Sequence, residues 1–126
     1  MIAADTSTWI AFIQGDSGKD VELLDAALAD RQALMAPAVL AELLSAPNLP
    51  CQTAESLSNI PLVEIGEGYW ERVGALRAKV LSKGRKARLG DALIAQSCLD
   101  RGISLITRDK DFRAFADAAG LKLAMP

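Results

Sequence analysis

The stretch "SLITRDKDF", residues 104–112, joins a short apolar segment to a dense group of polar and charged side chains. Residues 104–107 have the length and character of a buried strand. A hydroxyl and two carboxylates follow closely, on Thr107, Asp109 and Asp111. A surface turn would explain either aspartate taken alone, because aspartate is common in turns. The alternative is that these oxygen atoms meet carboxylates from other parts of the chain in a functional site.

Short apolar segments alternate with helical patterns over the whole chain. Strands are expected at residues 1–5, 33–37, 61–65, 104–107 and 121–124. Helices are expected at residues 6–15, 18–31, 37–46, 51–59, 67–84, 90–102 and 110–119. Apolar strands separated by helices predict an α/β fold, an α/β/α sandwich with helices on both faces of a parallel sheet. No linker interrupts the pattern, so we expect a single domain over residues 1–126.

The longest helical pattern lies at residues 67–84. Trp70, Val73, Leu76 and Val80 are expected on its apolar face, and Gly84 is expected to end the helix.

The composition excludes several kinds of chemistry. The 126 residues include no histidine, which rules out Ser-His-Asp and Cys-His nucleophiles and His-ligated zinc. Carboxylates, hydroxyls, lysines or a hard cation must therefore carry any catalysis. No apolar run reaches the roughly 20 residues that span a bilayer, and no secretory signal is evident. We expect a cytoplasmic protein without a membrane partner, in which Cys51 and Cys98 are reduced and mostly buried.

Charge is distributed unevenly along the chain. Residues 1–71 contain eleven acidic and two basic residues, whereas residues 72–126 contain five acidic and twelve basic residues. Half of the basic residues lie between Arg72 and Arg88. This asymmetry is compatible with a polyanionic partner, and a solvated helix face is the alternative.

Two acidic residues follow expected strands directly. In open parallel sheets, ligands bind beyond the carboxyl ends of the strands. Asp5 ends the first strand and Asp109 follows the fourth, with Asp111 as a competing candidate. Asp5 could instead cap the next helix, since aspartate is among the best N-caps.

Two further acidic residues lie on helices with apolar surroundings. Glu42 is the only charged residue in the helix expected at 37–46, so it either projects to solvent or is partly buried and needs a cation or hydrogen-bond donors. Asp91 opens the helix expected at 90–102 and could cap it. Because Ile94 and Cys98 share its face, Asp91 is expected to point towards the sheet.

Several carboxylates in one crevice would repel one another strongly unless a cation neutralised them. Ligand sets made only of oxygen atoms favour a hard ion, Mg²⁺ or Mn²⁺. Such an ion can activate water and stabilise an in-line displacement at phosphorus.

Four segments in this order resemble the PIN domain, specifically the VapC-type toxin of bacterial type II toxin–antitoxin systems. They are "AADTSTWI" (3–10), "VLAELLSA" (39–46), "GDALIAQSCL" (90–99) and "LITRDKDF" (105–112). The resemblance implies a sheet of four or five parallel strands. It also implies an Mg²⁺- or Mn²⁺-dependent endoribonuclease that hydrolyses RNA with a metal-activated water, forms a homodimer and is neutralised by a cognate VapB-type antitoxin.

The resemblance also implies roles for individual residues. The catalytic set would be Asp5, Glu42, Asp91, Asp109 and Thr107, with the metal held by Asp5, Asp91 and Asp109. Ser7 and Asp111 would lie beside this set. Apart from the resemblance, we expect the basic residues Lys83, Arg85, Lys86 and Arg88 to bind the RNA backbone, for which a solvated helix end is the alternative.

Two other functions remain as alternatives. A receiver-type phosphotransfer domain also combines a parallel sheet with a carboxylate pocket, but it would have adjacent acids after the first strand, where Asp5 stands alone. A non-catalytic PIN module that binds RNA or protein is the second alternative, and activity with and without EDTA would distinguish it from a nuclease.

Overall fold

Three parallel strands form the central sheet of the computed structural model, which describes residues 1–124. The strands are β1 (Ile2–Ala4), β2 (Ala33–Leu34) and β3 (Ser104–Ile106), in the order β2-β1-β3. Ile2 pairs with Ala33 on one side and with Ser104 on the other. The first strand is therefore central, and the parallel sheet expected from the sequence is confirmed.

The sheet has three strands rather than the four or five expected. The segments expected as strands at 61–65 and 121–124 each form one isolated parallel bridge, Met35 with Leu62 and Leu105 with Leu123. Two main-chain hydrogen bonds flank each bridge; at one edge, the Met35 N–H donates to Pro61 and the Val63 N–H donates to Met35. Pro61 has no N–H of its own, which limits the ladder at its start. These segments occupy the two edges without extending into strands.

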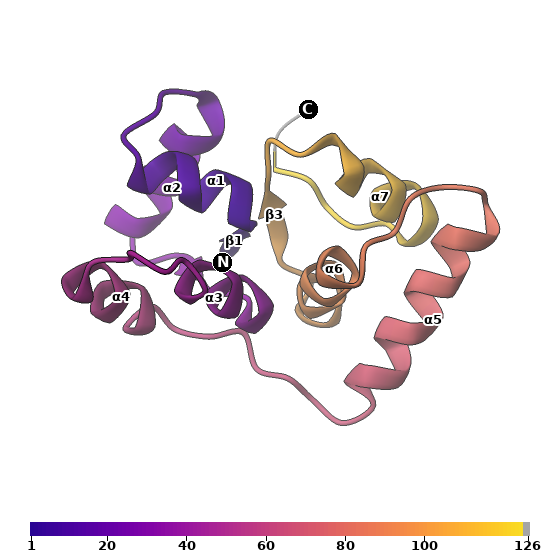
Figure 1. Cartoon of the computed structure of the whole chain (residues 1–126). Helices are drawn as coiled ribbons and strands as arrows, with labels where there is room; N and C mark the ends of the chain where they lie inside the picture. The colour runs from indigo at the N-terminus through magenta and orange to yellow at the C-terminus, as the bar shows by residue number, and fades with distance from the viewer. Residues whose placement is uncertain (125–126) are drawn as a thin grey trace.

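Helices fill the chain between the strands, each close to its expected position. They are α1 (Thr6–Ile13), α2 (Lys19–Ala29), α3 (Pro37–Leu44), α4 (Cys51–Ser58), α5 (Tyr69–Ser82), α6 (Leu89–Arg101), the 3₁₀ helix η1 (Lys110–Phe112) and α7 (Arg113–Ala119). Figure 1 shows α1 to α4 grouped on one side of the molecule and α5 at the opposite edge, beside α6 and α7. No helix within residues 1–124 is long and apolar enough to cross a membrane.

The buried face of α5 differs from the expected one by one residue. Tyr69, Val73, Leu76 and Val80 are buried, whereas Trp70 is 66% exposed. Spacings of four, three and four residues place the buried set on one stripe of the helix, and Trp70 lies off that stripe. The Tyr69 hydroxyl donates to the Leu93 carbonyl at 2.6 Å, so the buried aromatic ring also satisfies its polar end on α6.

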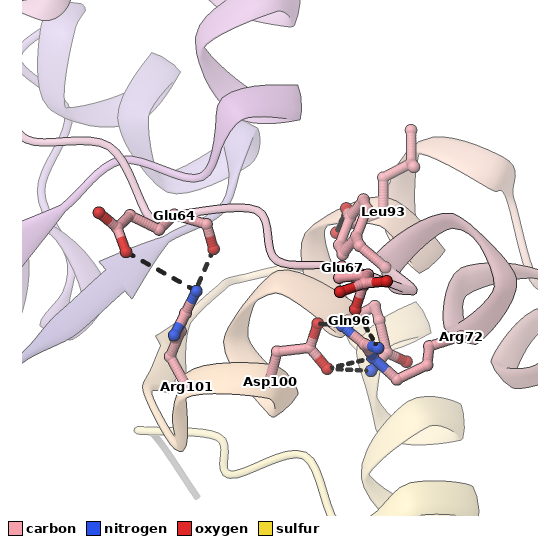
Figure 2. Close-up of polar contacts among 8 residues, drawn as sticks. Glu64, Glu67, Arg72, Leu93, Gln96, Asp100 and Arg101 are labelled. Carbon is pink, nitrogen blue, oxygen red and sulfur yellow. Dashed lines mark hydrogen bonds and ion pairs between the residues drawn. The ribbon is translucent and has the colours of Figure 1, made fainter.

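A forked ion pair joins the outer helix α5 to α6. Arg72 donates from Nε to Asp100 Oδ1 at 2.9 Å and from a terminal nitrogen to Oδ2 at 2.7 Å (Figure 2). Gln96 Nε2 also donates to Asp100 Oδ1, at 2.7 Å. Near the carboxyl end of α6, Arg101 contacts the Glu64 carbonyl and carboxylate (Figure 2). These contacts hold α6 from its outer side.

The two cysteines are free thiols in different surroundings. Cys98 is buried on α6 as expected, but Cys51 is exposed, so the expectation of two buried thiols was wrong for Cys51. Cys51 is the first residue of α4, a helix in which only Leu57 is buried.

The two tryptophans should differ sharply in their contribution to stability. Trp9 is 2% exposed, so Trp9→Ala should lower the free energy of unfolding by about 3–5 kcal/mol through lost burial and a cavity. Trp70→Ala should change it by no more than about 0.5 kcal/mol, as for most surface substitutions. Urea denaturation of both variants measures this difference. Equal losses would mean that Trp70 is covered in solution.

Candidate functional site

The pairing of β1 with β3 brings the polar ends of both strands to one edge of the sheet. The Asp5 N–H donates to the Ile106 carbonyl at 2.9 Å, which aligns the residue after β1 with the residues after β3. Thr107 follows Ile106 directly, and Asp109 and Asp111 come shortly after it in the same loop. Two segments about a hundred residues apart in sequence thus meet at the edge where parallel sheets bind ligands.

Asp5 both caps a helix and faces the other acids. Its Oδ1 accepts from the Thr8 N–H at 3.3 Å and from Ser7 Oγ at 2.7 Å, and it is the N-cap of α1. The residue is 3% exposed. Burial raises the pKa of the Asp5 carboxyl, and the charge of Asp109 raises it further, while the hydroxyls of Ser7 and Thr107 and the Thr8 N–H oppose the rise. The capping and site explanations are therefore compatible.

The loop after β3 is folded by its own side chains. Thr107 Oγ1 accepts from the Asp109 N–H at 2.9 Å, and Asp109 Oδ1 accepts from the Asp111 N–H at 2.9 Å. Asp109 is consequently the N-cap of η1. Such local hydrogen bonds stabilise a turn, and here they also orient two carboxylates.

Asp91 approaches the same loop from α6. The N-cap of α6 is Arg88, without a side-chain capping bond, so Asp91 does not cap the helix. Carboxylate oxygens of Asp91, Asp109 and Asp111 all lie within 4.8 Å of one another. We call these three residues the acidic cluster. Burial, followed by the charges of neighbouring acids, of which Asp109 acts most strongly, raises the pKa of Asp91 to about 6.

Glu42 lies at the rim of the site. It is exposed, so of the two alternatives left open by the sequence the structure shows the side chain in contact with solvent rather than partly buried. Its Oε1 accepts from Thr6 Oγ1 at 2.5 Å, which ties the side chain to the first turn of α1. Its Oε2 lies beside Gly90, where a Cβ atom would be 3.5 Å away. Glu42 therefore projects between α1 and the start of α6, towards Gly90, the residue that precedes Asp91.

One of the four basic residues at 83–88 contacts the acidic cluster. Lys86 Nζ is 3.3 Å from Asp111 Oδ2, and Arg85 pairs with Asp117 at 2.6 Å. Lys83 occupies the C-cap position of α5, and Arg88 occupies the N-cap position of α6. Neither of these two forms an ion pair within residues 1–124.

One acidic residue near the site escaped the sequence analysis. Asp20, in the first turn of α2, is 3% exposed and accepts hydrogen bonds from Arg108 and Thr8. Nothing in the local pattern distinguishes it from the other acids of α2. Arg108, by contrast, stands between Thr107 and Asp109 and could have prompted a search for its partner.

The donor set of this site fits a hard divalent cation. The grouped ligands are carboxylate oxygens, with hydroxyls of Ser7 and Thr107 close by, and the chain contains no histidine. Asp91 and Asp109 belong both to the acidic cluster and to the metal set expected from the sequence. Asp111 completes the acidic cluster, while Asp5 lies outside it but close enough to act on the pKa of Asp91.

Comparisons with known proteins give a family match and several similar structures. The family model of the PIN domain matches residues 2–118. The fold resembles VapBC-5 of Mycobacterium tuberculosis, a member of the VapBC family of toxin–antitoxin systems (TM-score 0.70, 23% identity, 97% of this chain and 95% of the other). It also resembles VapBC2 of Rickettsia felis, solved with a promoter DNA fragment (TM-score 0.74, 20% identity, 98% of this chain and 97% of the other). A third similar structure is FitAcB of Neisseria gonorrhoeae (TM-score 0.69, 19% identity, 98% of this chain and 96% of the other). At these identities the likeness shows a shared fold. No curated protein matched the chain.

The raised pKa of Asp91 predicts a pH-dependent stability in the absence of metal. In the folded protein the pKa of the Asp91 carboxyl is raised to about 6 from its ordinary value of 3.8. The contribution of Asp91 to the free energy of unfolding should therefore fall as pH rises from about 4 to about 6. Asp91→Asn removes this loss. The free energy of unfolding of the variant, relative to that of the wild type, should therefore increase over that range.

Urea denaturation in EDTA at several pH values between 4 and 7 tests this prediction. Asp25→Asn, an exposed residue of α2, is the control for the change from acid to amide. A constant difference between Asp91→Asn and wild type across the range would show that Asp91 is not destabilised in its charged form.

Proposed function

Because the chain belongs to the PIN domain family, we propose that it is a metal-dependent endoribonuclease and the toxin of a toxin–antitoxin pair. The observation that carries the proposal is the acidic cluster, joined by Asp5 and Glu42, at the carboxyl ends of β1 and β3. Charged groups packed this closely are costly to folding. A non-catalytic binding module would have no use for such a cost, which favours an enzyme.

We infer that Mg²⁺ or Mn²⁺ is held by Asp91 and Asp109, with Asp5 or Asp111 as a further ligand. When bound, such an ion would supply the positive charge that activates water and stabilises an in-line displacement at phosphorus. The residues of the chain prepare for this chemistry. Thr107 orients Asp109, Ser7 orients Asp5, and Lys86 partly neutralises Asp111.

The basic residues at 83–88 are proposed to bind the RNA backbone. Arg88 precedes α6, the helix that carries Asp91, and its charge acts on the Asp91 carboxyl, so a phosphate bound by Arg88 would lie close to the acidic cluster. Phosphate contacts position a nucleic acid without reading its bases. The identity of the cleaved sequence must depend on other contacts.

The partner is proposed to be a VapB-type antitoxin, and the active form a homodimer. The proteins of similar fold include VapBC toxin–antitoxin assemblies, one of them with promoter DNA. The proposal that this chain has a cognate antitoxin in the same cytoplasm rests on that likeness together with its family.

Glu42 tests whether the rim of the site takes part in catalysis. In Glu42→Gln we expect cleavage of RNA in Mn²⁺ to fall by at least about 10–100-fold, the usual cost of losing a group that supports a metal site. The fold should persist because Glu42 is exposed. Cleavage of a labelled RNA with Mn²⁺, and with EDTA as the blank, measures the effect.

Glu55→Gln is the matched control, because Glu55 is an exposed glutamate on α4. This variant should cleave RNA as the wild type does. Wild-type cleavage in Glu42→Gln would remove Glu42 from the site. Cleavage by the wild type in EDTA would contradict the metal dependence itself.

Salt dependence tests the basic residues. RNA binding should weaken with salt by roughly 0.7 log units per phosphate contact for each tenfold rise in concentration, because counterions are released. Lys83→Ala combined with Arg88→Ala should therefore flatten the slope and weaken binding to different RNAs alike. Affinity is measured at several salt concentrations in Ca²⁺, which we expect to support binding with little cleavage.

Arg31→Ala combined with Lys122→Ala carries the same change of charge at exposed positions outside α5 and residues 83–88 and serves as the control. An equal slope in both double variants would assign Lys83 and Arg88 to a solvated helix end.

A further inference from the structure

Asp20 forms a forked ion pair with a residue 88 positions away in the chain. Its Oδ2 accepts from Arg108 Nε at 2.7 Å, and its Oδ1 accepts from a terminal nitrogen of Arg108 at 2.9 Å. Thr8 Oγ1 also donates to Oδ2, at 3.0 Å. The Asp20 side chain is 5% exposed and that of Arg108 39% exposed. The carboxylate is thus buried and fully engaged.

The two partners of Asp20, Thr8 and Arg108, each connect it to a residue of the site. Thr8 donates its main-chain N–H to Asp5 Oδ1 while its hydroxyl binds Asp20, so one residue connects the two carboxylates. Arg108 lies between Thr107 and Asp109 in the chain, and it also donates to the Ser17 carbonyl at 3.3 Å. One buried carboxylate therefore fixes the turn that carries Asp5 and the loop that carries Asp109.

The turn before α2 is built around this ion pair. Gly18 has a φ of +148°, and a Cβ atom there would lie 2.6 Å from Asp20 Oδ1 and 3.0 Å from a terminal nitrogen of Arg108. A larger residue would push the carboxylate off the guanidinium. The Gly18 backbone therefore packs directly against the ion pair.

We propose that Asp20 is a positioning residue for the acidic site, acting through Arg108 on the loop at Thr107–Asp109 and through Thr8 on Asp5. The inference rests on the proposed function, because the geometry that it maintains is the one inferred to hold the divalent ion. Asp20 does not itself face the acidic cluster. Hydrogen bonds from Arg108 lower the pKa of Asp20, in agreement with a carboxylate that remains charged and paired.

The chain offers an internal control for loss of stability alone. Arg72 and Asp100 form the same fork, with bonds of 2.9 and 2.7 Å, between α5 and α6 (Figure 2). Neither residue belongs to the acidic cluster or contacts its loop. Asp100→Asn and Asp20→Asn therefore remove the same kind of ion pair, and only the second should disturb the site.

The test measures two quantities for Asp20→Asn, Arg108→Gln and Asp100→Asn. The first is the Mn²⁺ concentration that gives half-maximal RNA cleavage; the second is the rise in melting temperature on adding Mn²⁺, which requires no activity. Asp20→Asn and Arg108→Gln should each raise the Mn²⁺ concentration about tenfold or more and reduce the thermal shift. The variant carrying both changes should be little worse than either alone, because the two act through one connection. Asp100→Asn should match wild type in both quantities.

Wild-type Mn²⁺ dependence in Asp20→Asn, or equal changes in Asp20→Asn and Asp100→Asn, would overturn the inference. If Asp20→Asn does not fold, Arg108→Gln decides in the same way, since its side chain is partly exposed. If the wild type itself cleaves no RNA, the proposed function fails, and the thermal shift alone judges whether Asp20 positions the cation site.

Discussion

Repulsion among closely grouped, half-buried carboxylates is the constraint on which the architecture of this site depends. Asp91 and Asp109 meet with Asp111 within a few ångströms, and buried Asp5 lies close enough to act on Asp91. Burial and like charge together raise the pKa values of Asp5 and Asp91. Such a group would spread apart unless main-chain pairing, local hydrogen bonds and neighbouring cations held it. Much of the polar structure around the sheet serves that purpose.

The supports come from different levels of structure. Pairing of β1 with β3 sets the distance between the two loops, and hydrogen bonds within each loop aim the carboxylates. Lys86 and Arg108 bring positive charge from outside, one against Asp111 and one against Asp20. The fork of Arg72 on Asp100, by contrast, joins α5 to α6 without contacting the acidic cluster or its loop. Of the two forks, only that of Arg108 on Asp20 is connected to the residues of the site.

Apolar periodicity and the position of acids after strands determined most of the fold and most of the candidate site. The order of strands and helices follows from hydrophobic spacing, which is local. Asp5 and Asp109 could be chosen because parallel strands end at one edge of the sheet. The number of strands was overestimated, because an apolar segment such as 61–65 has the same sequence pattern whether it forms a full strand or a single bridge. The prediction that Trp70 lies on the buried face of its helix was wrong for a similar reason, because the neighbouring Tyr69 fits the same helical spacing and is buried instead.

Only the tertiary structure decided which side chains meet across the chain. Asp20 looks like any acid in the first turn of a surface helix, and its burial depends on Arg108, 88 residues later. The exposure of Glu42, its bond to Thr6 and its approach to Gly90 likewise depend on how α3 packs against α1 and α6. The sequence by itself determined the elements and the chemical type of the site, because both follow from local pattern and composition. Long-range pairing depends on packing between segments, which no local pattern encodes.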